Sequence, residues 1–470
     1  MFFNFVQNLK KRKRSRPRKN YNQIWKLGQK DFNTEYFDIN KDGELVIKEG
    51  NYQYNVYDLA RKFGSSMEIF MPFIVEERLS NIYKVANNNI KRFGYKGKFT
   101  YHFPIKVNQN KEAMLPLLSE GAHLEASSAN HLWIVKKLWM NESFNSKIRV
   151  VCNGAKTEQY INLIKDLRQA GLTIIPIIES TEEHKLLKGF GGELGVRINL
   201  KTRVKSHWDK KIDQFGLDFE EIKSLGRIRG LKVLHYHLGT QIEVENDIIR
   251  ALREGFVAYR KLREINPSLD TLNIGGGFAI PHENKKLYSV ESLMARIFKN
   301  LKSWSDKAGI PHPNLLVEWG TYVTGPAQLN VYKVVGSKSI PKAVAKQWYL
   351  IDGSFMNDLL DTWSIHQKWH VVAVNNLDAK HRNRVWLSGI SCDSDDKYTG
   401  NDYLLLPRLE DLNETESQFL AILDTGAYQD SFASHHCFLS SPAKIVLQNG
   451  IVTLARRRET PEDVGKLFGW

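Results

Sequence analysis

The chain has 470 residues, of which 42% are hydrophobic and 25% are charged, and its formal net charge is +15 at pH 7. These values predict an ordinary globular protein with two domains and exclude fibrous and wholly disordered chains. No apolar run approaches the roughly 20 residues of a membrane helix, and the apolar opening, residues 1–6, is too short for a signal peptide. Three widely spaced cysteines indicate neither a disulfide framework nor a Cys-x-x-Cys metal site, so we expect a reducing, cytoplasmic compartment; they are Cys152, Cys392 and Cys437.

The N-terminal extension, residues 1–35, carries eight positive charges between positions 10 and 19 with no acid among them. Like charges repel one another and stay solvated, so we expect a disordered tail. A nuclear-localisation or nucleic-acid patch is the alternative. No aromatic residue interleaves the basic run, which argues against stacking on bases.

The next stretch, 36–70, predicts two strands at 37–40 and 45–47 around a turn at 41–43. A short helix follows at 56–63 and ends at Gly64. We expect this stretch to pack with a β domain further along the chain.

Residues 71–320 alternate between helical and strand patterns, beginning with a helix at 74–91. Short apolar strands are predicted at 100–105, 147–151, 173–178, 195–200, 233–238, 271–274 and 315–318. Seven to eight such strands match the rhythm of a (β/α)8 barrel, in which the loops after the strands carry the chemistry. An open doubly wound sheet has a similar rhythm, so the pattern alone leaves closure undecided.

Residues 321–470 are rich in strand patterns, at 331–335, 348–351, 370–374, 384–387, 419–422 and 445–447. They predict a second domain of the all-β class.

Two charged side chains stand at or inside apolar strands of the first domain. Lys106 follows the apolar stretch YHFPI, and its apolar flanks predict a partly desolvated amine. Desolvation favours the neutral amine, which condenses with a carbonyl group, although a strand-end lysine is more often a solvated rim residue. Arg197 lies within GVRIN at 195–199, where a buried charge normally has a partner. Glu125, in LEASS, reads on its own as a loop residue.

Two later motifs in the first domain suggest ligand binding. His235 and His237, in LHYHLGTQI, are predicted to face the same side of a strand. They could be a pair of metal ligands or histidines of the core. The glycines of NIGGGF, Gly275, Gly276 and Gly277, allow backbone N–H groups to approach an anion closely.

Four motifs complete the set. Glu318 stands in VEWGT, Asp361 in GSFMNDLLDTW and Tyr428 in TGAYQ. Cys392 and Asp393 open SCDSDD, whose clustered acids could bind a divalent cation.

In this order the motifs resemble those of the biosynthetic arginine decarboxylases, in a short branch of the alanine racemase and ornithine decarboxylase type (fold type III). The resemblance covers nearly all of the chain after residue 36. It implies a PLP-binding (β/α)8, TIM-like barrel at 71–320 and a C-terminal β-sandwich or β-barrel domain at 321–470. It also implies a homodimer or higher homo-oligomer with shared active sites.

The resemblance assigns roles to individual residues. Lys106 would hold pyridoxal 5'-phosphate (PLP) as a Schiff base, Cys392 would return a proton to the reacting Cα, and Asp361 and Asp393 would bind the distal cation of the substrate. Glu318 would lie opposite the pyridine nitrogen and keep the ring an electron sink. The remaining cofactor contacts are with the ring or the phosphate; they are Glu125, Arg197, His237, Thr240, Gly275, Gly276, Gly277 and Tyr428. Thr321 stands where the family usually has an arginine that helps to hold the phosphate.

The implied reaction is decarboxylation of a basic L-amino acid, first L-arginine to agmatine and CO2, in polyamine and spermidine biosynthesis. Ornithine, lysine, diaminopimelate and carboxynorspermidine are alternative substrates, and a non-catalytic regulator with the same fold is the alternative from another class. A Mg2+ ion is implied by the resemblance alone, and we assign no metal ligands. Neither a membrane nor a nucleic acid is an expected partner, apart from the basic tail.

Overall fold

The structure is a computed structural model that describes residues 3–4, 24–140, 148–204, 213–282, 285–412 and 416–470. The N-terminal extension predicted at 1–35, with its basic run at 10–19, lies outside the described residues up to position 23, apart from residues 3–4. Its last part departs from the expected disorder, because Trp25, Leu27 and Phe32 are buried and a 3-10 helix forms at Lys30–Phe32. The chain divides into two compact units, which we call the β unit (Met1–Val75, Ile280–Lys286 and Thr324–Trp470) and the barrel unit (Glu76–Ala279 and Leu287–Val323). The main boundaries fall within a few residues of the predicted positions 70 and 320. The excursion of Ile280–Lys286 into the β unit was not predicted.

The barrel unit contains a closed barrel of eight parallel strands in the order β10-β11-β12-β13-β6-β7-β8-β9. Pairing of β13 with β6 closes the ring, with Leu315 opposite Phe99, so the barrel prediction is confirmed and the open sheet is excluded. The strands are β6 (Phe99–Pro104), β7 (His123–Ala126), β8 (Arg149–Cys152), β9 (Thr173–Ile178), β10 (Leu194–Arg197), β11 (Leu231–His235), β12 (Thr271–Asn273) and β13 (Asn314–Val317).

Branched apolar side chains explain why these short segments become buried strands. In β9, five of the six residues, Ile174 to Ile178, are buried. A hydrophobic cluster joins four of the strands through Val151, Ile175, Ile177, Val233 and Leu316. Packing of this kind fills the barrel, which leaves the strand ends as the place for a site.

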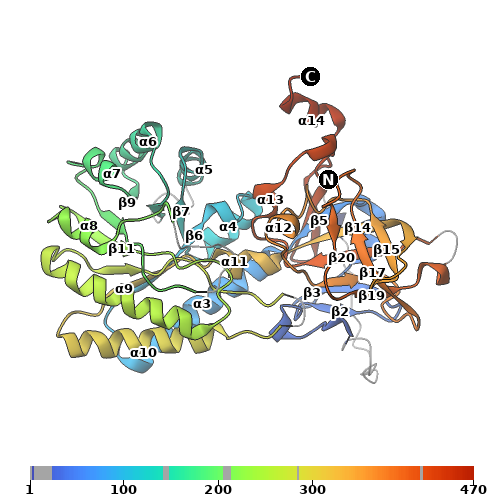
Figure 1. Ribbon diagram of the computed structural model, residues 1–470, viewed down its shortest axis with the longest axis horizontal. Coiled ribbons are helices and arrows are strands. Elements are labelled where there is room, and N and C mark those ends of the chain that lie inside the picture. The colour runs from blue at the N-terminus through green and yellow to red at the C-terminus, as the bar shows by residue number, and fades with distance from the viewer. Residues whose placement is uncertain (1–2, 5–23, 141–147, 205–212, 283–284, 413–415) are drawn as a thin grey trace. The chain divides into compact units, whose positions relative to one another are not determined.

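Helices follow most of the strands, and Figure 1 shows α9 and α10 side by side along the barrel unit. Side-chain caps fix several helix starts: Thr157 accepts from the N–H of Tyr160 in α6, and Ser180 accepts from that of Glu183 in α7. Among the described residues, no helix is both long and apolar enough to cross a membrane. The helices are α3 (Pro72–Phe93, starting at the unit boundary), α4 (Lys111–Ser119), α5 (Ala129–Trp139), α6 (Glu158–Gln169), α7 (Thr181–Leu186), α8 (Phe219–Ser224), α9 (Glu245–Ile265), α10 (Val290–Ala308) and α11 (Gly320–Thr324).

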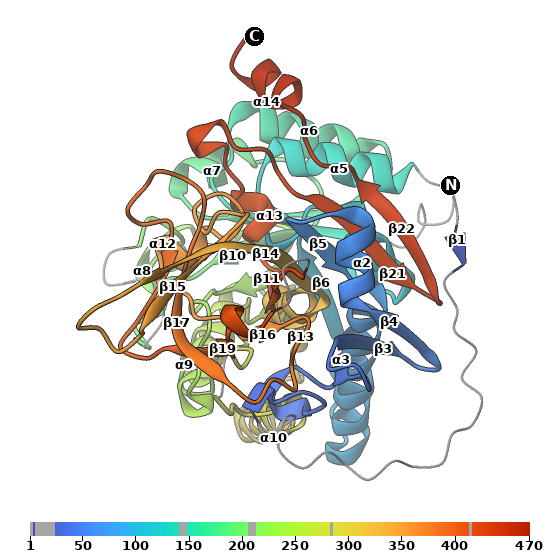
Figure 2. The ribbon, with the colours of Figure 1, turned by 90° about the vertical axis from the view of Figure 1, so that its right-hand side faces the viewer.

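The β unit is built on an 11-stranded mixed sheet, in which Figure 2 shows β21 and β22 as long neighbouring strands. Strand β5 pairs with β14 in antiparallel and with β21 in parallel orientation, which is how the segment before the barrel joins this sheet. The sheet strands are β1 (Phe3–Asn4), β5 (Met67–Phe70), β14 (Gln328–Ser339), β15 (Gln347–Ile351), β16 (Val371–Ala373), β17 (Arg382–Ser388), β18 (Lys397–Tyr398), β19 (Leu404–Pro407), β20 (Phe419–Leu423), β21 (Ala443–Gln448) and β22 (Ile451–Arg456). The helices are α2 (Val56–Phe63), α12 (Asp361–Ser364), α13 (Gln429–Phe432) and α14 (Pro461–Leu467).

A separate three-stranded sheet, β2 (Phe37–Ile39), β3 (Leu45–Glu49) and β4 (Tyr52–Asn55), precedes α2. Its strands pair with one another, Phe37 with Ile47 and Val46 with Asn55, and not with the strands of the larger sheet. The helix after it was predicted correctly: Asn55 caps its first turn and Gly64, with φ +75°, ends it.

Candidate active site

Polar or charged residues lie at the carboxyl ends of all eight barrel strands, within two residues of the last residue of each strand. Because the strands are parallel, these ends meet at one end of the barrel. In strand order from β6 to β13 the residues are Lys106, Glu125, Asn153, Glu179, Arg197, His235, Asn273 and Glu318. The sequence motifs had singled out five of these side chains.

Lys106 lies in a short 3-10 turn, Ile105–Val107, that directly follows β6. Its Nζ is 3.9 Å from Oε2 of Glu125, which stands opposite Pro104 in the neighbouring strand β7. The Lys106 side chain is 45% exposed, so the predicted desolvation of its amine is not found. The strand ends at Pro104, before the lysine, and the amine remains accessible to a carbonyl compound.

Glu125 is fully buried, and among the described residues neither carboxylate oxygen has a hydrogen-bond partner. Burial raises its pKa to about 7, and the negative charges of Glu318 and Glu179 act in the same direction, while Lys106 and the nearby amide of Asn153 oppose them. The Asn153 amide is too poorly placed to form a hydrogen bond of good geometry with Glu125. Burying a carboxyl group without a well-formed hydrogen bond costs free energy. Glu125 is therefore suited to contact a bound ligand.

Glu318 follows β13, is buried, and is held by two asparagine amides. Asn273 donates to its Oε1 at 2.7 Å, and Asn153 lies 3.3 Å from both oxygens. Its own N–H donates to the carbonyl of Gly275 at 2.9 Å, which ties β13 to the glycine motif. Asn153 was missed by sequence reasoning. Its position directly after an apolar strand was the available signal.

Arg197 ends β10, and its Nη1 donates to Oε2 of Glu179 at 3.1 Å. Its guanidinium also lies over the ring of Phe215, 4.7 Å from the centroid. The other oxygen of Glu179 accepts the N–H of Gly154 at 2.5 Å. The sequence predicted that Arg197 needs a partner, and Glu179 is that partner. A carboxylate directly after a buried strand could have identified it.

The two histidines do not share a strand, because β11 ends at His235. His235 is buried, and its pKa is lowered to about 3 by burial and by the charge of Arg197. His237 lies in the following loop, where its Nδ1 accepts the N–H of Gly276 at 3.3 Å. Within the described ranges no three His, Cys, Asp or Glu side chains form a group that could hold a metal ion.

The glycine motif packs so closely against neighbouring backbone that any side chain at these positions would collide with it. A Cβ on Gly275 would lie 2.6 Å from the carbonyl oxygen of Tyr236, and one on Gly277 would lie 2.7 Å from that of Gly239. Both glycines have positive φ angles, +65° and +102°. The N–H of Gly275 donates to Oδ1 of Asn273 and that of Gly276 to His237. Phosphate contacts from these two N–H groups therefore stay a prediction.

These features of the barrel unit fit PLP. An accessible amine stands beside a buried carboxyl group that has no donor, and a second buried carboxylate is held rigidly by two amides. The loop of His237 and the glycine motif are in contact, and the His237 ring accepts the N–H of Gly276. Thr240 lies half-buried in the same loop. Lys106 would hold the cofactor and Glu318 would face its nitrogen.

In the β unit, Asp361 begins α12 and is buried. Gln429 clamps it: its Nε2 donates to Oδ2 at 2.8 Å, and its Oε1 lies 3.3 Å from the backbone nitrogen of Asp361. The neighbouring Tyr428 has a left-handed backbone with φ +68°. Gln429 thus joins two predicted motifs that are 68 residues apart. Gln429 is the last residue of the TGAYQ motif, but sequence reasoning assigned no role to it.

Cys392 and Asp393 lie beside a second loop of the β unit. The Sγ of Cys392 is 3.5 Å from that of Cys437, and Oδ2 of Asp393 is 3.5 Å from Nε2 of His436. Asp396, from the same acidic cluster, is buried and accepts the backbone N–H groups of Phe355 and Ser391. This acid caps loops, so the cluster is not the cation site that the sequence left open.

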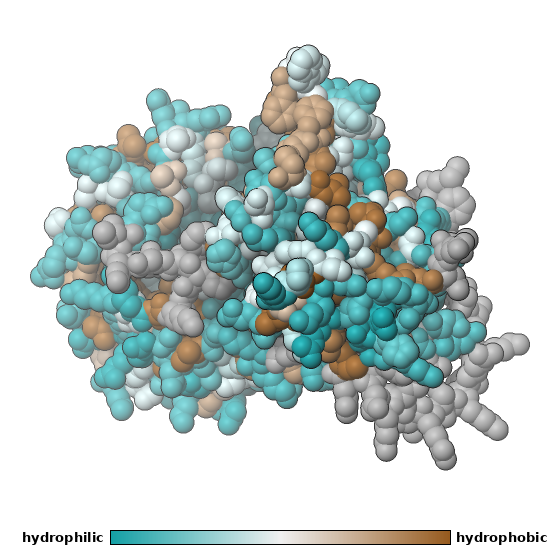
Figure 3. Space-filling model, turned by 45° about the vertical axis from the view of Figure 1, so that its right-hand side comes forward, coloured by the Kyte–Doolittle hydropathy of each residue, from teal (hydrophilic) through white to brown (hydrophobic). Residues whose placement is uncertain are grey.

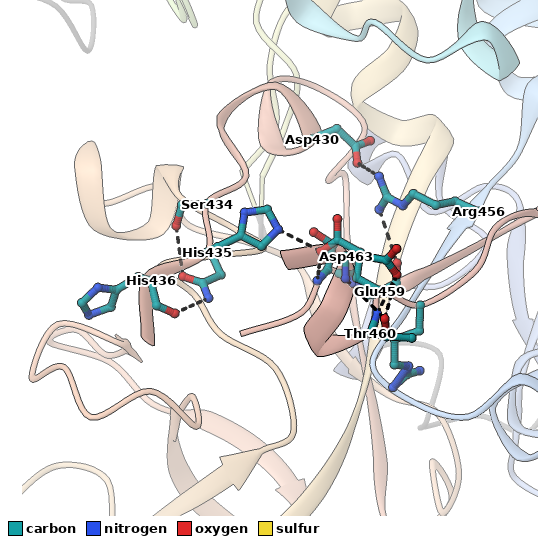
Figure 4. Close-up of polar contacts among 12 residues, drawn as sticks. Asp430, Ser434, His435, His436, Arg456, Glu459, Thr460 and Asp463 are labelled. Carbon is teal, nitrogen blue, oxygen red and sulfur yellow. Dashed lines mark hydrogen bonds and ion pairs between the residues drawn. The ribbon is translucent and has the colours of Figure 1, made fainter. Parts of the chain in front are cut away.

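The loop of Cys437 is anchored along its length (Figure 4). Oγ of Ser434 donates to Oδ1 of Asn357 at 3.0 Å, and Nδ2 of Asn357 donates to the carbonyl of His436 at 2.9 Å. His435 Nε2 lies 2.8 Å from a carboxylate oxygen of Glu459. The predicted site residues therefore form one group in the barrel unit and another in the β unit.

Comparison with known proteins identifies the family. Residues 79–325 match the pyridoxal binding domain of the pyridoxal-dependent decarboxylases. The chain is 24% identical to the biosynthetic arginine decarboxylase of Bacteroides thetaiotaomicron, over 86% of this chain and 84% of that protein. It spans only about half the length of several other bacterial arginine decarboxylases that it matches.

Solved structures agree with the fold. The biosynthetic arginine decarboxylase of Campylobacter jejuni aligns with a TM-score of 0.79 and 20% identity, over 96% of this chain and 92% of that one. A diaminopimelate decarboxylase from M. jannaschii, solved with L-lysine, aligns with a TM-score of 0.76 and 24% identity, over 92% and 97%. Because the family match covers more than half of the sequence and the eight-stranded barrel that carries the candidate site, the chain belongs to the pyridoxal-dependent decarboxylases.

Proposed function

We propose that this pyridoxal-dependent decarboxylase acts on a basic L-amino acid and that L-arginine is its substrate, with agmatine and CO2 as products in polyamine biosynthesis. The observation that carries the choice of a basic substrate is the buried carboxylate of Asp361, oriented by the amide of Gln429. An oriented anion selects a substrate with a cationic far end. Similarity along most of the chain to arginine decarboxylases favours arginine among such substrates.

In the proposed reaction, bound PLP supplies the electron sink for the electron pair that remains when the bond from Cα to the carboxyl group breaks. Lys106 would attach the cofactor, and the buried carboxylate of Glu318 would keep a proton on the ring nitrogen. Hydrogen bonds from the amides of Asn273 and Asn153 fix the orientation of the Glu318 carboxylate. Arg197, paired with Glu179, and Glu125 would line the cofactor ring, and His237 would offer its aromatic ring for stacking.

The phosphate would be bound by Thr240, by backbone groups of Gly275, Gly276 and Gly277, and by the hydroxyl group of Tyr428. Thr321 contributes at most a neutral hydrogen bond where relatives have a charged arginine. Cys392 would donate the proton that replaces CO2 on Cα. Asp393 would join Asp361 in binding the distal cation. A Mg2+ requirement remains implied by resemblance only.

We also propose a homodimer in which Cys392 and Asp393 act in the partner's site. Exposed apolar side chains next to these loops support this proposal, because such patches commonly mark interfaces. Phe438 follows Cys437 and contacts Phe468, with ring centroids 5.8 Å apart, and Leu467 and Trp470 are also exposed. In Figure 3 the tip that holds the C-terminal segment carries tan and brown side chains.

Subunit exchange tests the shared site. If Lys106→Ala and Cys392→Ala are each inactive, mixing them should restore activity, since half of the mixed dimers' sites would be intact. Random exchange then gives about a quarter of wild-type activity. Confirmed exchange without any recovery would show that each site is built within one chain.

The substrate proposal is tested by measuring CO2 release with PLP and, in turn, arginine, ornithine, lysine, diaminopimelate and carboxynorspermidine. We expect the highest kcat/KM with arginine. Borohydride should fix the cofactor to wild-type protein but not to Lys106→Ala, which should lose about 10³-fold or more in activity. If another amino acid has a higher kcat/KM than arginine, that amino acid is the substrate and the proposal of arginine is wrong. Cofactor fixed at Lys106 without CO2 from any substrate would identify a non-catalytic relative.

A further inference from the structure

Two of the three cysteines, distant in sequence, meet in the β unit. Cys392 and Cys437 are 45 residues apart, both are exposed, and their sulfurs are 3.5 Å apart. Cys152, the third cysteine, is buried in β8 of the barrel unit. The sequence predicted no disulfide framework, and all three cysteines are free thiols in the structure. The proximity of Cys392 and Cys437 could not be read from their spacing.

The backbones on both sides of the pair are held in place. Cys437 has a left-handed φ of +58°, and the preceding residue, His436, is tied to Asn357 through its carbonyl group. On the other side, the N–H of Ser391 donates to the buried Asp396 at 3.0 Å. A disulfide needs its sulfurs at about 2.05 Å, so the thiols must close by roughly 1.5 Å, which side-chain rotation and small loop shifts can supply.

We propose that Cys392 and Cys437 form a modification site that reacts with low-molecular-weight disulfides, such as oxidised glutathione, and is converted to an intrachain disulfide. One thiolate attacks a sulfur of the reagent, whose S–S bond breaks and releases one thiol. The second cysteine, after losing its proton, attacks the mixed disulfide and releases the second thiol. The two cysteines are oxidised, and the reagent is reduced to two thiols.

The same pairing affects the reduced protein. The hydrogen bond and charge of Cys437 raise the pKa of the Cys392 thiol, and Asp393 adds to this shift. Cys392 therefore keeps its proton at neutral pH, which suits a proton donor and makes its exchange slower than that of an activated thiol. A disulfide sulfur has no proton to give. On the proposed function, oxidation of the pair therefore stops product formation.

The test treats PLP-loaded protein with oxidised glutathione and follows intact mass, cysteine-containing peptides and CO2 release. We expect wild type to lose two hydrogens in mass and to yield a Cys392–Cys437 linked peptide, reversed by dithiothreitol. Cys437→Ser and Cys437→Ala lack the second thiol, so they should accumulate one glutathione on Cys392 and yield no linked peptide. Cys152→Ser is the matched control and should behave as wild type, because the thiol of Cys152 is buried.

Stable glutathione adducts on wild type, or no linked peptide at any excess of reagent, would overturn the proposed site. The mass readout does not depend on turnover, so it judges the site even if arginine is not the substrate. In protein that releases CO2, activity should fall about tenfold or more in step with the linked peptide. Full activity in the linked protein would instead refute the proton-donor role of Cys392 in the proposed function.

Discussion

Two buried groups of charged side chains, one in each unit, differ in how their charges are satisfied. In the β unit, Lys444 and Arg456 lie between Glu68 and Asp430. Lys444 is 3.2 Å from Oε2 of Glu68 and is bonded to Asp430, while Arg456 is 2.8 Å from Glu68 and 3.5 Å from Asp430. Figure 4 shows the side chains of Asp430 and Arg456 pointing toward each other. Each acid thus meets two cations.

In the barrel unit, Glu125 is equally buried, but its nearest cation, Lys106, is 3.9 Å away and neither oxygen accepts a hydrogen bond from the described residues. Burial raises the pKa of both Glu68 and Glu125 to about 7. A raised pKa therefore does not distinguish the two acids. The lack of a hydrogen bond of good geometry on either oxygen of Glu125 does distinguish them, and it marks Glu125 as part of a site that a bound group completes.

The largest effect should come from breaking the satisfied group. Lys444→Met removes a buried cation while keeping its apolar volume, and Arg456 alone must then balance Glu68 and Asp430. We expect the free energy of unfolding in urea to fall by about 3–5 kcal/mol. Lys302→Met is the control, since Lys302 pairs with Asp306 on the exposed face of α10; it should change stability by about 0–1 kcal/mol. An equal loss of unfolding free energy in both variants would mean that burial does not determine how much an ion pair contributes to stability.

A smaller effect is expected for Gln429→Met, which removes the amide that orients Asp361. A hydrogen bond to a charged group contributes about 1.5–3 kcal/mol, so KM for the basic substrate should rise roughly 10- to 100-fold. Gln429→Glu should raise KM further because two carboxylates would then meet. We expect kcat to change less than KM, as measured by steady-state CO2 release. A loss confined to kcat would show that Asp361 does not bind the ground state of the substrate.

The smallest effect should come from Glu125→Gln in PLP-free protein. The folded-state pKa of Glu125, about 7, exceeds the ordinary value of about 4.3. Between these values the folded state binds more protons than the unfolded state, so stability falls as pH rises from about 4.5 to 7. Glu68 contributes with the same sign. Glu125→Gln should therefore reduce, but not abolish, the decline.

The measurement is urea unfolding of both proteins at pH 5, 6 and 7.5. The variant should be as stable as wild type at pH 5 and more stable at pH 7.5, by about 1 kcal/mol or more, since a neutral amide removes the buried charge. A less stable variant at pH 7.5 would mean that the Glu125 carboxylate is already satisfied inside the polypeptide.

Local sequence was sufficient for elements whose signals lie within one segment. The helix at 56–63 was predicted to the residue, with Gly64 as its end, and β9 was predicted to the residue because an apolar, branched run defines it. Strand β7 was missed as an element because its four residues include a histidine and a glutamate. The resemblance in motif order predicted that Lys106, Glu125, Arg197 and Glu318 share one site, and all four lie at the carboxyl ends of barrel strands.

Only the tertiary structure decided which of these side chains meet. Arg197 finds Glu179 because β10 pairs with β9, and Glu318 finds Asn153 across 165 residues because the barrel closes. Likewise, Cys392 meets Cys437, and Gln429 meets Asp361, through loops brought together by the β unit. The physical reason is that pairing depends on strand order and register, which are global properties of the packed chain. Composition, periodicity and spacing act within single elements and contain no information about which elements become neighbours.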